Sequence, residues 1–134
     1  MPYKYNVSCK ENIIYTRFYG VLTDADLVGQ AKDAAANDLI RPNFREVVDL
    51  SQVREIKATK HSLDEIIISD KAHDEKIKGL KTAIVAPTDL LYGCSRMFGI
   101  LTDVNYAPST VQVFRTHDEA RDWLQIPKDI CPPI

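Results

Sequence analysis

The sequence predicts one α/β domain with the element order β-β-α-β-α-β-α-β-α and a mixed, mainly parallel sheet. Short runs rich in β-branched and aromatic residues alternate with longer segments whose apolar residues recur at helical spacing. The chain of 134 residues is long enough for one hydrophobic core, and it contains no internal repeat. A hydrophobic content of 45% and a charged content of 27% are typical of a folded globular protein.

The N-terminal part is predicted to form an antiparallel hairpin followed by a helix. Two strand-like runs, 3–8 and 13–19, flank the polar residues 9–12, and we expect Gly20 to end the second strand. Thr23 can then cap a helix whose first turn is acidic, which suits the positive end of the helix dipole. One face of this helix carries small residues that permit close packing on a sheet: Leu27, Ala31, Ala34 and Ala35.

The middle of the chain is predicted to supply a central strand and a crossover helix. Residues 44–50 contain two consecutive valines, as is typical of a strand buried on both faces. We expect 51–60 to be a loop and the charged stretch 69–79 to be a solvated helix end and loop. A parallel sheet needs a crossover between the strand that ends at Leu50 and the next strand, which begins near Lys81. We therefore predict a helix between the two loops, with the apolar stripe Leu63, Ile66 and Ile67.

The stretch 80–103 organises the rest of the fold, because a buried strand at 82–86 leads through a tight loop into a long helix. The main apolar stripe of this helix is expected to be core, and it consists of Leu90, Cys94, Met97, Phe98 and Leu101. Leu91 and Ile100 lie off this stripe, where they are available for a groove or a dimer contact.

A last strand at 110–114 and a last helix complete the predicted domain, which we place at residues 1–126. Thr116 and Glu119 have the spacing of a capping box, a specific sign of a helix start. Pro127 stops this helix, and residues 127–134 are expected to be a C-terminal tail on the surface.

Several functional classes have no support in the sequence. The net charge of −2 and the scattered basic residues give no basic face for nucleic acid. Neither metal-binding spacings of His or Cys nor nucleotide-binding glycine motifs occur, so we expect no metal and no cofactor. No apolar run is long enough to span a membrane, and we expect no signal peptide, because the first residues have no apolar stretch. Cys9, Cys94 and Cys131 are expected to be free thiols, which favours a cytoplasmic protein.

Polar side chains gather where the predicted parallel strands end. Asp49 and Ser51 lie at the end of one strand, Asp89 follows the next, and Arg115 lies at the end of the last. Because these strand ends meet at one edge of the sheet, the side chains can bind a small polar ligand, or they can cap helices and pair with one another. Tyr92 and Arg96 are four residues apart, so they can stack on one helix face beside this edge, and Phe98 follows them.

Several segments together resemble the SpoIIAA-like, or STAS/SEC14-type, family of small bacterial proteins. These segments are 19–23, 48–53, 81–86, 92–98 and 113–124. The resemblance implies strands stacked in sequence order with helices mainly on one side of the sheet, and it does not imply an enzyme. Anti-sigma-factor antagonists of this fold carry an Asp-Ser-Ser-Gly segment whose serine is phosphorylated. The aligned residues here are 57–60, in which Thr59 alone retains a hydroxyl as a phospho-acceptor.

Three functional hypotheses follow. The first is a non-enzymatic regulatory module that binds itself, as a homodimer, or another protein. The second is a carrier or sensor of a small apolar or amphipathic ligand, possible at a membrane surface, with a pocket between the long helix and the sheet near Tyr92, Arg96 and Phe98. The third is an enzyme that uses Asp49, Asp89 and Arg96.

Overall fold

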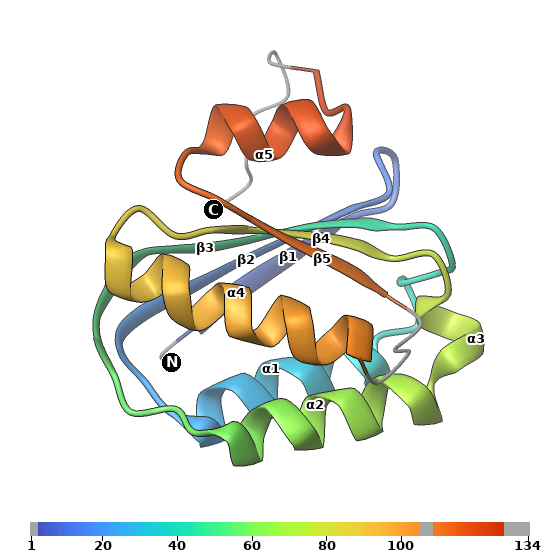
Figure 1. The fold of residues 1–134 in the computed structure, drawn as a ribbon. Coiled ribbons are helices and arrows are strands. Elements are labelled where there is room, and N and C mark those ends of the chain that lie inside the picture. The colour runs from blue at the N-terminus through green and yellow to red at the C-terminus, as the bar shows by residue number, and fades with distance from the viewer. Residues whose placement is uncertain (1–2, 105–108, 128–134) are drawn as a thin grey trace.

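The computed structural model describes residues 3–104 and 109–127, which form one sheet with helices on both of its faces (Figure 1). The strands are β1 (Tyr3–Ser8), β2 (Ile13–Leu22), β3 (Arg45–Ile56), β4 (Lys81–Val85) and β5 (Thr110–Phe114). The helices are α1 (Asp24–Ala36), α2 (Lys60–Ala72), α3 (Asp74–Ile77), α4 (Asp89–Val104) and α5 (His117–Leu124).

The five strands lie side by side in the order of the sequence, β1-β2-β3-β4-β5. The strands β1 and β2 pair antiparallel, and the three other neighbouring pairs are parallel. The predicted fold class is therefore confirmed as a mixed, mainly parallel five-stranded sheet in a single domain.

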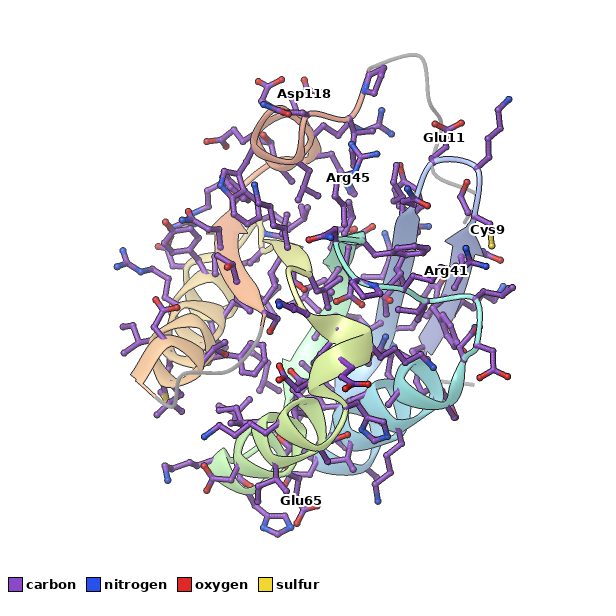
Figure 2. All side chains as sticks on the ribbon, turned by 90° about the vertical axis from the view of Figure 1, so that its right-hand side faces the viewer. Cys9, Glu11, Arg41, Arg45, Glu65 and Asp118 are labelled. Atoms are coloured by element: carbon purple, nitrogen blue, oxygen red, sulfur yellow. The ribbon has the colours of Figure 1, made fainter. Side chains whose placement is uncertain are left out.

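Helices α1, α2 and α4 cover one face of the sheet, and α5 covers the other (Figure 1), so the helices lie mainly on one side as expected. Successive residues of a strand point to opposite faces. On β3, Val47 packs with the residues beneath α5, whereas Leu50 packs with the core beneath α1 and α4. Arg45, labelled in Figure 2, helps to hold α5 in place. Its Nη1 donates to the carbonyl oxygens of Leu124 and Gln125, both at 3.1 Å.

Strands β2 and β3 extend beyond their predicted ends. Gly20 does not end β2, because its φ of +67° accommodates a register shift between Gly20 and Val21, and the strand continues to Leu22. The prediction of a loop at 51–60 is wrong for 51–56, which pair with the end of β2 as far as Leu22 and Ile56. This pairing joins segments distant in sequence, and the polar composition of 51–56 conceals it.

Two helical regions, 69–79 and α4, differ from their predictions. The stretch 69–79 contains the end of α2 and the short helix α3, whose Ile77 is buried. The stripe expected to be core on α4 is wrong in part, since Leu90 is 66% exposed and Met97 is 53% exposed. Helix α4 is rotated so that Leu91 and Ser95 face the sheet, and Leu91 is therefore core. The predicted cap of α5 is confirmed, because the Thr116 hydroxyl accepts a hydrogen bond from the backbone N–H of Glu119 at 3.2 Å.

Candidate functional site

Asp49 lies at the centre of a polar cluster beneath the start of α5. Its side chain is buried, and Oδ2 accepts hydrogen bonds from Arg17 Nε at 2.9 Å and from His117 Nε2 at 3.4 Å. Oδ1 accepts from the backbone N–H of Ser51 at 2.8 Å. Burial raises the pKa of Asp49, but the hydrogen bonds from His117 and Ser51 outweigh this effect and hold it below its ordinary value. Both carboxylate oxygens are therefore engaged in joining β2, β3 and α5.

Asp89 and Arg115 form a second cluster at the ends of β4 and β5. Arg115 Nη1 donates to Asp89 Oδ1 at 2.8 Å, and the guanidinium carbon lies 4.3 Å from the centre of the Tyr92 ring. Both charged side chains are solvent-exposed, and surface ion pairs contribute little to stability. The strand ends therefore form two clusters rather than one, because Asp49 faces α5 and Asp89 begins α4 on the other side of the sheet.

The other predicted residues lie apart from both clusters. Arg96 is exposed on α4. Thr59 caps α2: its hydroxyl accepts from the backbone N–H of His61 at 3.3 Å and donates to Asp24 Oδ2 at 2.7 Å. Hydrogen bonds from the backbone and side chain of Thr59 lower the pKa of Asp24. The role of Thr59 as a phospho-acceptor stays a prediction.

A cavity of about 260 Å³ lies between the sheet and helices α1, α2 and α4. Its wall is mainly apolar, and two predicted site residues contribute to it, Phe98 and Thr59. Tyr92 and Arg96 do not line this cavity, although they were expected beside it. Residues that are both exposed and part of the wall mark its opening to solvent: Thr59, Lys60, His73 and Met97. The apolar wall includes Phe18, Leu22, Leu27, Leu63, Ile66, Ile84 and Leu91.

The sheet contributes a buried carboxyl group to the cavity wall. Glu46 Oε1 accepts from the Thr82 hydroxyl at 3.0 Å, and Oε2 accepts from Thr16 and from Gln30 Nε2, both at 3.4 Å. Burial raises the pKa of Glu46, and these neutral donors offset only part of the effect. The carboxyl group thus has hydrogen-bond partners but no cationic one among them.

A second carboxyl group reaches the cavity from α2. Burial, together with the charge of Glu46, raises the pKa of Asp70 from 3.8 to about 7. Within residues 3–104 and 109–127, neither Glu46 nor Asp70 forms an ion pair. The basic residues at the opening have other partners, since Lys60 Nζ lies 3.2 Å from Asp64 and a ring nitrogen of His73 lies 2.8 Å from the Ser69 carbonyl oxygen.

Sequence reasoning missed Glu46, Asp70, Gln30 and Thr82. A signal was present for Glu46, which shares the face of β3 with Val48 and Leu50 and is therefore a charged residue at an inward-facing strand position. A signal was also present for Asp70, which stands three and four residues after Ile67 and Ile66 and is therefore a charged residue on the apolar stripe of the predicted helix.

The comparisons with known proteins concern the fold. An uncharacterized protein of the DUF3478 family from Shewanella loihica PV-4, described as having a SpoIIAA-like fold, is similar with a TM-score of 0.56. The two chains are 16% identical, and the similarity covers 91% of this chain and 93% of that chain. This protein has a SpoIIAA-like fold.

The anti-sigma factor antagonist SpoIIAA in its unphosphorylated form is also similar, over 92% of this chain. The aligned part is 97% of that chain, with 10% identity and a TM-score of 0.49. No family model matches this sequence, and a search of curated proteins finds no match.

Two further observations bear on the site. Among the described residues, no three His, Cys, Asp or Glu side chains are grouped so that they could hold a metal ion. The helices of the same residues include none that is long and apolar enough to cross a bilayer.

Proposed function

We propose that this protein binds a small amphipathic molecule in the cavity between the sheet and helices α1, α2 and α4. The observation that carries the proposal is the cavity itself, about 260 Å³ in volume with a mainly apolar wall. For comparison, an engineered apolar cavity of about 150 Å³ is large enough to bind benzene. The site therefore suits a ligand larger than a single aromatic ring.

The energetic argument also favours an occupant. Because the cavity opens to solvent, its apolar wall is in contact with water when no ligand is bound. A bound apolar molecule removes this wall from water, at a gain of about 25 cal/mol for each Å² of apolar surface covered. Ligand binding therefore stabilises the folded protein.

Replacing Ala31 with Phe tests this proposal. Ala31 lines the cavity from α1, so the larger side chain fills part of the ligand's volume. Ala36 is exposed on the same helix, and Ala36→Phe is the matched control. Native mass spectrometry of the freshly purified protein reports a retained molecule, and calorimetric titration with decanol measures binding directly.

We expect decanol to bind the natural protein and the Ala36→Phe variant, and to bind Ala31→Phe at least about tenfold more weakly, as for a blocked pocket that loses about 1.4 kcal/mol. Equal decanol affinity for the two variants would contradict the position of the site. The absence of decanol binding to the natural protein, together with no retained molecule, would overturn the proposed function.

A second candidate function is self-association, favoured by one face of α4. Leu90, Met97 and Ile100 are 66%, 53% and 55% exposed, respectively. A second copy of the chain can cover such a face in a symmetric dimer. Light scattering of the natural protein and of a Met97→Lys, Ile100→Lys variant tests this function. A dimer that the variant abolishes supports it, a monomer at high concentration contradicts it, and binding of the monomer to lipid vesicles would instead assign the face to a membrane surface.

A further inference from the structure

We infer that the ligand of this cavity carries a protonated amine, which is held between the carboxyl groups of Glu46 and Asp70. This inference rests on the proposed function and specifies the chemical class of the ligand. It is carried by three features of the cavity: the position of the carboxyl groups, the absence of a basic partner for them in the described structure, and the apolar character of the remaining wall.

The two carboxyl groups come from opposite walls at one end of the cavity. Glu46 is the second residue of β3, and Asp70 lies in the last turn of α2. These positions share the end of the molecule where α3 follows α2 (Figure 1). The opposite end is lined by apolar side chains from the ends of β2 and β3, including Leu22 and Ile56, and by Thr59 and Lys60 at the start of α2, where Lys60 pairs with Asp64. A ligand with one polar end and an apolar body matches this arrangement.

The charges around the acidic end favour a cation. The ionisable residues of the cavity wall are Glu46, Asp70, Cys94, Lys60 and His73. Lys76 of α3 donates to the carbonyl oxygen of Ala35 at 2.7 Å, so its ammonium group satisfies the end of α1. No ion pair among the described residues involves either carboxyl group. The C-terminal end of α2 adds a partial negative charge beside Asp70.

A cation between Glu46 and Asp70 stabilises the ionised form of these buried carboxyl groups. A buried carboxylate without a cationic partner is poorly solvated, whereas an ammonium group supplies both opposite charge and hydrogen-bond donors. A ligand with a carboxylate group would instead place a third acidic group at this end, and a neutral alcohol would supply no opposite charge. The site therefore discriminates among ligands of equal chain length by the charge of the head group.

The affinity of the cavity for an amine and its affinity for a fatty acid should change in opposite directions with pH. Because the pKa of Asp70 is raised to about 7, this carboxyl group is largely protonated at about pH 5.5 and largely ionised at about pH 8.5. Amine binding needs the ionised carboxylate, so its affinity rises between these pH values. The affinity of a fatty acid falls over the same range, and that of an alcohol changes least.

Decylamine, decanol and decanoic acid test the inference on the full chain, because they share one apolar body. At about pH 8.5 we expect decylamine to bind at least about tenfold more tightly than decanol, as expected for a desolvated charge pair. Glu46→Gln and Asp70→Asn should each remove most of this preference while decanol still binds. Glu65→Gln is the matched control, since Glu65 lies on the outer side of α2 and points away from the sheet (Figure 2), and it should retain the preference.

The results separate this inference from the proposed function. Decanol binding with no preference for decylamine, or a preference that survives both substitutions, overturns the amine inference and leaves the cavity as a ligand site. Tighter binding of decanoic acid than of decylamine also overturns it. If none of the three probes binds, both proposals fail. Decanol binding by each variant shows that the variant is folded, and Asp70→Asn provides a second test if Glu46→Gln does not fold.

Discussion

Replacing Asp70 with Asn should stabilise the protein at neutral and alkaline pH. Asp70 is a helical residue whose carboxyl group faces an apolar cavity and the buried Glu46. Burial and the charge of Glu46 raise the pKa of Asp70 from 3.8 to about 7. The folded protein therefore holds this proton more tightly than the unfolded chain does. Asn retains the shape of the side chain but cannot ionise.

The sign of the effect follows from proton linkage. Between about pH 4 and pH 7 the folded state binds more protons at this site than the unfolded state, so the free energy of unfolding falls as pH rises. The loss is complete above the raised pKa. The difference between 3.8 and about 7 corresponds to about 4 kcal/mol, at about 1.4 kcal/mol per pKa unit. This value is an upper figure, because rearrangement of the site and entry of water reduce it.

Urea unfolding between about pH 5 and about pH 8 measures this contribution. We expect the natural protein to lose stability over this range and Asp70→Asn to lose clearly less, so that the variant is the more stable one at the upper end. Glu65→Gln changes a partly exposed acid on the outer side of the same helix and should follow the natural protein. Parallel pH profiles for the natural protein and Asp70→Asn would refute the reasoning, since the Asp70 carboxyl group would then titrate alike in the folded and unfolded chains.

Three further substitutions give separate predictions. Asp49→Asn should lower the free energy of unfolding by about 3 kcal/mol, measured in urea at neutral pH. The substitution removes the buried negative charge that Arg17 and His117 contact, so these two side chains lose their acidic partner. Phe98→Asp should abolish decanol binding in calorimetry while the circular dichroism spectrum is retained, because Phe98 lines the cavity. Thr59→Ala should lower stability by about 1 kcal/mol in thermal unfolding, because it removes the cap of α2 and the hydrogen bond to Asp24.

Each of these predictions has a contradicting outcome. A stability of Asp49→Asn equal to that of the natural protein would show that the cluster beneath α5 contributes nothing. Unchanged decanol affinity in Phe98→Asp would exclude Phe98 from the site, and Thr59→Ser, which keeps the hydroxyl, should restore the melting temperature lost in Thr59→Ala. Failure of that rescue would mean that the hydroxyl is not the stabilising group.

The sequence by itself determined the order of the strands and of the four longer helices, and the class of the sheet, but not the short helix α3. Alternation of strand-like and helical patterns gives parallel strands joined by helices, since each period matches one backbone geometry. Local chemistry also determined the start of α5, because the Thr116 hydroxyl and the Glu119 N–H lie within one helical turn. These features depend on residues close together in the chain, and sequence patterns report such residues directly.

Only the tertiary structure decided which faces meet. The rotation of α4 exposes Met97 and buries Leu91, although both are apolar residues of the same helix. The cavity arises where three helices and the sheet leave space between them, and it brings Glu46 together with Asp70 from positions that the sequence separates by a strand, a loop and a helix. Burial and the distance between charges, which set the pKa of both groups, are properties of the packed molecule and not of any local stretch.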